Sequence, residues 1–275
     1  MTAWSWIKHI FTKNEDQGDP GQIPLFTDSE MEWYLLQVYS GMITDHNLSI
    51  EYHYKVAAYL QQALAEGFGP PITTEAYEAY IGLRKHIYIF SAAKQYSQVR
   101  EMSALINLKG NTGDFKSFRE TADKIFGTYN KTYLKTEYTT AVGQSEMAKQ
   151  WVEFQATKAT MPKLRYHTQL DARVRDEHAA LEGITLPVDD KFWNTYMPKN
   201  GWRCRCFVTQ ETDEEPETDM SQKTIPEWGD KAFPKVFRMN PGKDQLIFNP
   251  RFHPYFRVAP GDSDFKAENF GLPTS

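Results

Sequence analysis

Cysteine is scarce in this chain, as are long apolar runs and any large excess of one charge. Only two cysteines occur among 275 residues, Cys204 and Cys206. A disulfide across one intervening residue is strained and closes almost no loop, so the pair suits a reducing compartment. No run of 18 apolar residues is present, so we expect no transmembrane helix. We also expect no secretory signal, because Lys8 and His9 interrupt the apolar residues at the start.

The formal charge is −5, but the acidic residues are unevenly distributed. The stretch from Glu211 to Asp219 holds six acids and no base, so the remaining residues carry a formal charge of +1. This charge balance does not indicate nucleic-acid binding as the main function, although it is compatible with a local basic face. With 40% hydrophobic and 24% charged residues, the composition is that of a globular protein. This excludes a wholly disordered, collagen-like or disulfide-rich chain.

Helical periodicity dominates residues 28 to about 158, between clear start and stop signals. The first predicted helix begins with a capping box at Ser29–Glu32 and continues through Tyr39, and the second runs through Tyr54 to Leu64 and ends near Gly67. The third runs from Thr74 to about Leu108, with Gly110 as its stop. The last two run from Asp114 through Ile125 and from about Thr128 to Thr157.

The pattern changes after Pro162, where proline and glycine become frequent and apolar runs become short. Helical spacing persists over Asp171–Leu181, and the runs at Phe207–Thr209 and Gln245–Phe248 indicate brief strands. We therefore predict an α+β fold, with a helical N-terminal half followed by a compact domain of helices and short antiparallel strands. The expected divisions are an N-terminal arm and linker at 1–26, a helical region at 27–124, the compact domain at 125–245 and a C-terminal tail at 246–275.

The expected arm carries Trp4, Ile7 and Phe11 at helical spacing, and a polar linker rich in turn formers follows at 13–22. Three interpretations are open. The segment folds back on the protein's own core, docks on a partner, or lies on a membrane surface.

The segment around His178 predicts a short helix with one inward face. Asp171 is a candidate N-cap and Gly183 a candidate C-terminal stop. Val174, His178 and Leu181 then share one face, so the imidazole points inward.

The two cysteines follow a predicted turn that includes Asn200 and Gly201. If the following residues alternate as in a strand, the two thiols lie on one face together with Trp202. That arrangement would bring the sulfur atoms into the same interior as the imidazole of His178.

Three interpretations of the two thiols and His178 are open. They are three ligands of a metal, most naturally zinc, whose fourth ligand would be His167, His253, Asp189 or Asp190. Alternatively, both thiols are small core side chains and the imidazole bonds to a backbone carbonyl. The third interpretation is a redox or catalytic thiol, for which the spacing shows no activating base.

Arg203 and Arg205 fall on the opposite face from the thiols in this arrangement. They form either a solvated, ion-paired edge or a contact to phosphate or an acidic partner. Arg165, Arg173 and Arg175 would widen such a basic patch.

Two carboxylate features accompany these residues. Asp171 and Arg175 are i, i+4 neighbours on the predicted helix and can pair. Asp189 and Asp190 after a proline are expected to cap or brace a turn, with paired catalytic carboxylates as the alternative.

Seven short elements occur in a fixed order along the second half of the chain. They are Tyr133–Ala141, Lys163–Tyr166, Asp171–Arg175, His178–Gly183, Pro187–Trp193, Asn200–Cys206 and Phe237–Gly242. In this combination the chain resembles, over about residues 125–245, the phage Mu F-like minor head protein family, also called the head morphogenesis or MuF domain. Lys199 stands where a second proline is commoner, and an acidic insert follows Thr209, but neither departure touches the histidine or cysteine positions.

The resemblance marks a set of structural motif residues in this chain. They are Asp171, Arg175, Gly183, Asp189, Asp190, Trp193, Asn200, Gly201, Trp202, Asn240, Pro241 and Gly242.

The resemblance implies a low-copy, non-enzymatic minor capsid protein of a tailed double-stranded DNA phage or prophage. It would act in head morphogenesis by docking to portal and capsid proteins, and Arg203 and Arg205 would contact DNA. Its place would be the head interior or portal vertex of the virion, and the host cytoplasm during assembly. Neither a membrane nor a small-molecule substrate is expected as a partner.

Two rival hypotheses remain open from the sequence. One is a metal-dependent hydrolase with an ion near His178, Asp189 and Asp190, which requires an open coordination site with activated water. The other is a DNA-binding module, whose affinity should fall steeply with salt.

Overall fold

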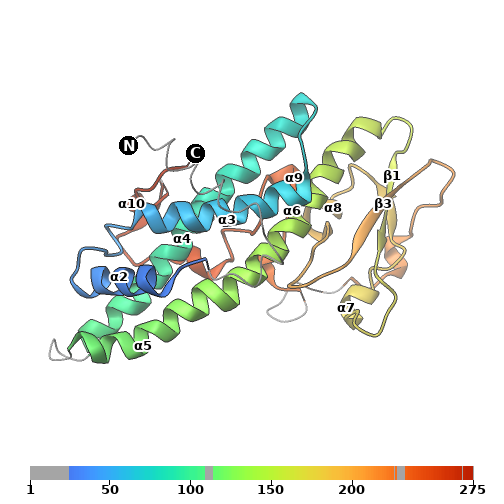
Figure 1. The fold of residues 1–275 in the computed structure, drawn as a ribbon. Helices are drawn as coiled ribbons and strands as arrows, with labels where there is room; N and C mark the ends of the chain where they lie inside the picture. The colour runs from blue at the N-terminus through green and yellow to red at the C-terminus, as the bar shows by residue number, and fades with distance from the viewer. Residues whose placement is uncertain (1–24, 109–113, 226, 228–232, 268, 275) are drawn as a thin grey trace.

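The structure is a computed structural model that describes residues 25–108, 114–225, 227, 233–267 and 269–274. A body of long helices occupies one end of the molecule and a small sheet the other, and helix α6 runs between them (Figure 1). The α+β fold predicted from the sequence is confirmed. The expected arm with Trp4, Ile7 and Phe11, and the helix stop at Gly110, lie outside the described residues.

The predicted long helices are all present, with shifted ends. They are α2 (Asp28–Tyr39), α3 (Ile50–Phe68), α4 (Thr74–Leu108), α5 (Phe115–Gly127) and α6 (Leu134–Thr157), with the π-helix η1 (Thr128–Tyr133) between the last two. The capping box predicted at Ser29 is wrong, because Thr27 caps α2 and pairs with Glu30. Helix α4 begins at Thr74, as predicted, and Thr73 caps it, since the Thr73 hydroxyl accepts from the Ala76 amide.

The second half consists of short elements. In chain order they are β1 (Lys163–His167), α7 (Asp176–Ala179), β2 (Thr185–Pro187), α8 (Trp193–Tyr196), β3 (Phe207–Glu211), η2 (Met220–Gln222), η3 (Lys235–Phe237), α9 (Pro241–Asp244), η4 (Pro254–Phe256) and α10 (Ser263–Ala267). The strand predicted at Gln245–Phe248 is wrong, because Gln245 ends α9 in the left-handed conformation at φ 55°.

The sheet has the order β2-β1-β3, and both pairings are antiparallel. Leu164 on the central strand lies opposite Leu186 and Gln210, and Tyr166 lies opposite Val208. Leu164 and Tyr166 are fully buried. One face of the sheet therefore covers an apolar core.

The described residues form two hydrophobic cores, and α6 contributes to both. The larger core joins α2 to α6 with side chains after residue 245, among them Phe248, Phe256 and Phe270. The stretch expected as a C-terminal tail is thus packed into the helical body. The smaller core surrounds Trp193 under the sheet and receives Phe154 from the end of α6.

The crossing of α3 and α6 depends on a residue without a side chain. A methyl group at Gly67 would overlap the backbone carbonyl of Val142. Glycine therefore allows the two helix backbones to approach closely enough to bury their apolar faces. None of the helices in the described ranges combines the length and the apolar character needed to cross a bilayer.

Candidate functional site

His178, Cys204 and Cys206 meet at one end of the smaller core. The Nδ1 atom of His178 lies 3.5 Å from the Sγ atom of each cysteine. His178 and Cys206 are buried, and Cys204 is half-buried. The three donor atoms lie within 4.8 Å of one another, and no other group of three or more histidine, cysteine or acidic side chains gathers so closely in the described part of the chain.

The local backbone at the cysteines differs from the predicted strand. Residues 201–204 form a turn in which Arg203 takes a positive φ of 57°, and β3 begins only at Phe207. The Cys204 amide donates to the Gly201 carbonyl at 3.1 Å. The turn, rather than strand alternation, brings both sulfur atoms to the same imidazole.

The helix predicted over Asp171–Leu181 is likewise reduced to the single turn of α7, and Asp171 does not cap it. Instead, the Asp171 carboxylate accepts two hydrogen bonds from Arg205, at 2.6 and 2.8 Å. The Arg205 guanidinium in this way lowers the pKa of Asp171 to about 2. The pairing of Asp171 with Arg175 predicted from the spacing is therefore wrong.

Arg175 provides a second connection between the two segments. Its Nη2 donates to the Trp202 carbonyl at 2.7 Å, and its Nη1 lies 3.4 Å from Nε2 of His178. Together with the Asp171–Arg205 pair, this contact fixes the histidine segment against the cysteine turn.

The surroundings shift the pKa values of the two thiols in opposite directions. A hydrogen bond from Cys206, together with the bond to His178, holds the pKa of Cys204 well below its usual range. The same contact with Cys204, together with burial, raises the pKa of Cys206. The cluster therefore combines two sulfur donors of unequal acidity with one imidazole, which are soft and intermediate ligands by chemical type.

His167 and His253, two candidates for a fourth ligand, lie outside this cluster. His167 contacts Glu182 at 3.3 Å through Nδ1 and Thr209 at 2.9 Å through Nε2. His253 is buried in the larger core, where its side chain accepts from the Tyr255 amide.

Asp189 and Asp190 also lie outside the cluster. Asp189 pairs with Lys158 at 3.0 Å, and Asp190 accepts from the Phe192 amide at 2.7 Å. Asp190 thus braces a turn, as expected. The grouping required by the hydrolase hypothesis, with His178 and both aspartates together, is not found among the described side chains.

The remaining motif residues support the fold around the cluster. Trp193 is fully buried and donates through Nε1 to the Pro187 carbonyl at 3.0 Å. Asn200 is also buried and accepts from the Tyr166 hydroxyl at 2.8 Å. Gly183 takes a positive φ of 72° just after the α7 turn.

The Asn240-Pro241-Gly242 element closes this region against α8 and α6. The Asn240 side chain caps α9 and donates to the Trp193 carbonyl at 3.1 Å. Gly242 lies so close to the Trp151 side chain that a methyl group would not fit. Trp202 packs at the edge of the larger core, with its ring 4.9 Å from that of Phe237.

Sequence reasoning missed a buried ion pair in the helical body. Nζ of Lys94 lies 2.8 and 3.0 Å from the carboxylate oxygens of Glu137, and the Tyr255 hydroxyl donates to the same carboxylate at 2.7 Å. The signal was present, because Lys94 follows the buried Phe90 by four residues and so falls on an apolar helix face.

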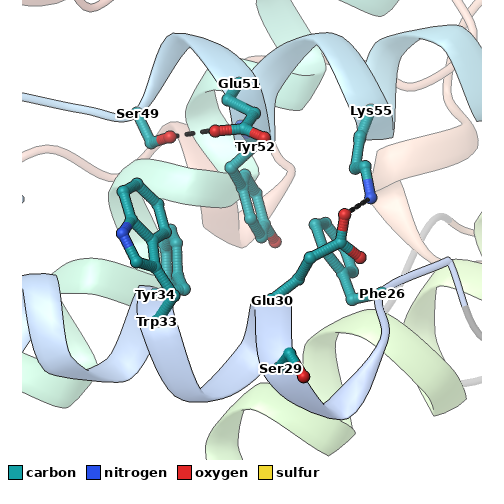
Figure 2. A pocket seen from close by; sticks show the side chains of 9 residues that line it. All are labelled: Phe26, Ser29, Glu30, Trp33, Tyr34, Ser49, Glu51, Tyr52 and Lys55. Carbon is teal, nitrogen blue, oxygen red and sulfur yellow. Dashed lines mark hydrogen bonds and ion pairs between the residues drawn. The ribbon is translucent and has the colours of Figure 1, made fainter.

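The described part of the helical body has open pockets on its surface. One, of about 550 Å³, lies beside Tyr255 and Trp202. A second, of about 420 Å³, lies between α2 and α3. In Figure 2, Lys55 of α3 reaches across the second pocket to Glu30 of α2, with Phe26 beside them and Trp33 further along.

Comparisons with known proteins agree with these motifs. The profile of the family described as Phage Mu protein F like protein matches residues 93–209. The match begins before the expected position 125, within α4, and ends before the Asn240–Gly242 element.

Two curated relatives are similar over part of the chain. The putative capsid assembly protein F of Escherichia phage Mu is 36% identical over 75 residues, which are 27% of this chain and 17% of that protein. The Mu-like prophage FluMu F protein of Haemophilus influenzae is 36% identical over 78 residues, 28% of this chain and 18% of its own length. The matched segments thus span less than a fifth of either relative. No solved structure matches the chain significantly.

The matched residues 93–209 contain the Trp193, Asn200 and CxC elements on which the resemblance was predicted. The resemblance is therefore confirmed over this region, where the chain is similar to the Phage Mu protein F like proteins.

Proposed function

We propose that this chain is a minor head protein of a tailed phage or prophage, which acts in head assembly as a component of the virion. The observation that carries the proposal is the family match over residues 93–209, together with a relative described as a putative capsid assembly protein. The mechanism we propose is docking, in which the chain binds the portal or another head protein.

The distribution of exposed apolar side chains supports docking through the helical body. Eleven large hydrophobic side chains are exposed among the described residues, and eight of them lie between positions 33 and 81, outside the family match. These eight are Trp33, Leu36, Met42, Ile50, Tyr54, Ile72, Tyr77 and Ile81. Apolar and aromatic side chains are enriched at protein interfaces, and the segment before the family match exposes more of them than the matched segment does.

The pocket between α2 and α3 lies within this part of the chain. Trp33 is 48% exposed and lines the pocket, whose wall also includes the Glu30–Lys55 ion pair (Figure 2). A hollow with an aromatic wall and one charged pair suits a side chain or a short helix of a protein partner.

Co-purification with the portal protein encoded by the same phage tests this proposal. We expect Trp33→Ala and Tyr54→Ala to weaken recovery of the complex. Tyr133→Ala and Leu170→Ala are matched controls, because both side chains are exposed but lie in the family-matched region. If portal and capsid proteins are recovered equally with all four variants, the proposal that the chain docks through the helices that carry Trp33 and Tyr54 is wrong.

DNA contact is the second part of the proposal, and the structure separates the two candidate arginines. Arg205 is held by the Asp171 carboxylate, whereas Arg203 is exposed on the turn. A phosphate contact therefore falls to Arg203. We expect Arg203→Ala to reduce DNA affinity at low salt more than Arg205→Ala does, and the affinity to fall with added salt. No measurable affinity at low salt would remove DNA contact from the proposal.

A further inference from the structure

We propose that His178, Cys204 and Cys206 bind one divalent transition metal ion, and that zinc is the metal this ligand set suits best. The proposal rests on the geometry of these side chains and stands apart from the proposed role in head assembly. Thiolate and imidazole are the soft and intermediate ligands that tetrahedral zinc sites use.

The two nitrogen–sulfur distances match the corresponding edges of a zinc tetrahedron. With Zn–S bonds of about 2.3 Å and Zn–N bonds of about 2.0–2.1 Å, a tetrahedral angle separates nitrogen from sulfur by about 3.6 Å. Both observed Nδ1–Sγ distances are 3.5 Å. The imidazole therefore already stands at the separation from each sulfur that a bound ion needs, as in a preorganised site.

The surroundings hold the three ligands in this arrangement from several directions. The Phe233 ring lies 4.6 Å from the His178 ring, and Arg175 ties the α7 segment to the Trp202 carbonyl. Lys199 donates from Nζ to the Cys206 carbonyl at 3.1 Å. Such surrounding contacts orient metal ligands in proteins and add to metal affinity.

Charge also favours a dication. Metal binding releases the remaining thiol proton, and the two thiolates with a neutral imidazole then carry a total charge of −2, which a divalent ion balances. Coordination by Nδ1 places the ring proton of His178 on Nε2. The 3.4 Å contact to Nη1 of Arg175 then loosens, while the 2.7 Å bond from Nη2 to Trp202 remains. Three protein ligands leave one position of the tetrahedron to water or another donor.

The first test uses the full-length protein without any substitution. The protein is purified under reducing conditions, stripped with a chelator and titrated with Co²⁺, which reports on ligands by its absorption. We expect saturation at one ion per chain, with a thiolate-to-cobalt charge-transfer band and the strong visible bands of tetrahedral cobalt. Stoichiometric Zn²⁺ should then displace the cobalt and remove both signals. A titration without a charge-transfer band overturns the proposal.

Variants then assign the ligands. Cys204→Ser, Cys206→Ser and His178→Gln should each weaken Co²⁺ binding at least tenfold, with the charge-transfer band halved or lost in the cysteine variants. His167→Gln is the matched control, because that histidine lies nearby on β1 but bonds to Glu182 and Thr209. Equal cobalt affinity in all four variants would contradict the assignment.

Thiol reactivity provides a readout that core packing alone would not change. Because the chain has no other cysteine, a thiol reagent reports only on Cys204 and Cys206. We expect Zn²⁺ to slow modification of both thiols and a chelator to restore it. Equal rates with and without Zn²⁺, or a disulfide between the two cysteines in protein that takes up no cobalt, would overturn the metal site.

Discussion

The ion pair between Lys94 and Glu137 gives the sharpest prediction about stability. Both side chains are almost completely buried, at 0% and 3% exposure. Lys94 also lies 5.1 Å from the ring centre of Tyr255 and 5.4 Å from that of Tyr129. Lys94→Met keeps the shape of the side chain but removes its charge, and leaves the carboxylate buried without its cation.

The size of the effect follows from proton uptake, by which the carboxylate of Glu137 loses its charge once its cation is gone. An unperturbed glutamate titrates near pH 4.3, so proton uptake at pH 7 costs about 3.7 kcal/mol at 1.36 kcal/mol per pH unit. This value lies within the roughly 3–5 kcal/mol typical of breaking a buried pair from one side. We therefore expect Lys94→Met to lower the free energy of unfolding by about 3–4 kcal/mol at pH 7. Proton uptake also predicts a smaller loss, by about 1.4 kcal/mol, at pH 6.

A double-mutant cycle isolates the pair itself. In the variant Lys94→Met/Glu137→Gln no charge remains, and the amide oxygen can still accept from the Tyr255 hydroxyl. The double variant should therefore be more stable than Lys94→Met alone, by about 1–2 kcal/mol. Urea denaturation at pH 7 and pH 6 measures the free energy of unfolding of the parent protein, of Lys94→Met, of Glu137→Gln and of the double variant. A loss below about 1 kcal/mol for Lys94→Met, or one that does not change with pH, would refute the reasoning.

Two further predictions concern protons and helix contact. Burial lowers the pKa of His53 and His86 to about 4 and that of His253 to about 3. The unfolded chain takes up these protons below about pH 6.5 while the folded rings stay neutral, so stability falls from pH 6.5 toward pH 4, by about 2 kcal/mol per ring at pH 5. The urea midpoint should therefore drop between pH 7 and pH 5, and a constant midpoint would contradict this. Separately, Gly67→Ala should lower the melting temperature by several degrees, because the methyl group would overlap the backbone of α6. Gly127→Ala is the control, because Gly127 has open space around it, and this substitution should be neutral or stabilising by about 0.5–1 kcal/mol. Equal effects of the two substitutions would show that the loss of stability in Gly67→Ala does not come from the crossing of α3 and α6.

The long helices could be predicted from the sequence because their signals are local. Asp114 accepts from the Ser117 amide and begins α5, as its position before the apolar pattern predicted. The short elements could not be predicted in the same way. The periodicity from Asp171 to Leu181 fits a helix, yet Asp171 binds Arg205 from across the fold, and only one helical turn forms. A contact between residues 34 positions apart has no local sequence signal.

The candidate site shows the same division. The sequence by itself determined which ligand types are available, since its only cysteines are Cys204 and Cys206 and His178 falls at an inward position. Tertiary structure decided which of them meet. The left-handed turn at Arg203 brings both sulfur atoms to 3.5 Å from one imidazole nitrogen, and hydrogen bonds to Glu182 and Thr209 hold His167 elsewhere. Residue chemistry can be read from the order of the chain, whereas the distance between side chains far apart in sequence is fixed only when the backbone packs.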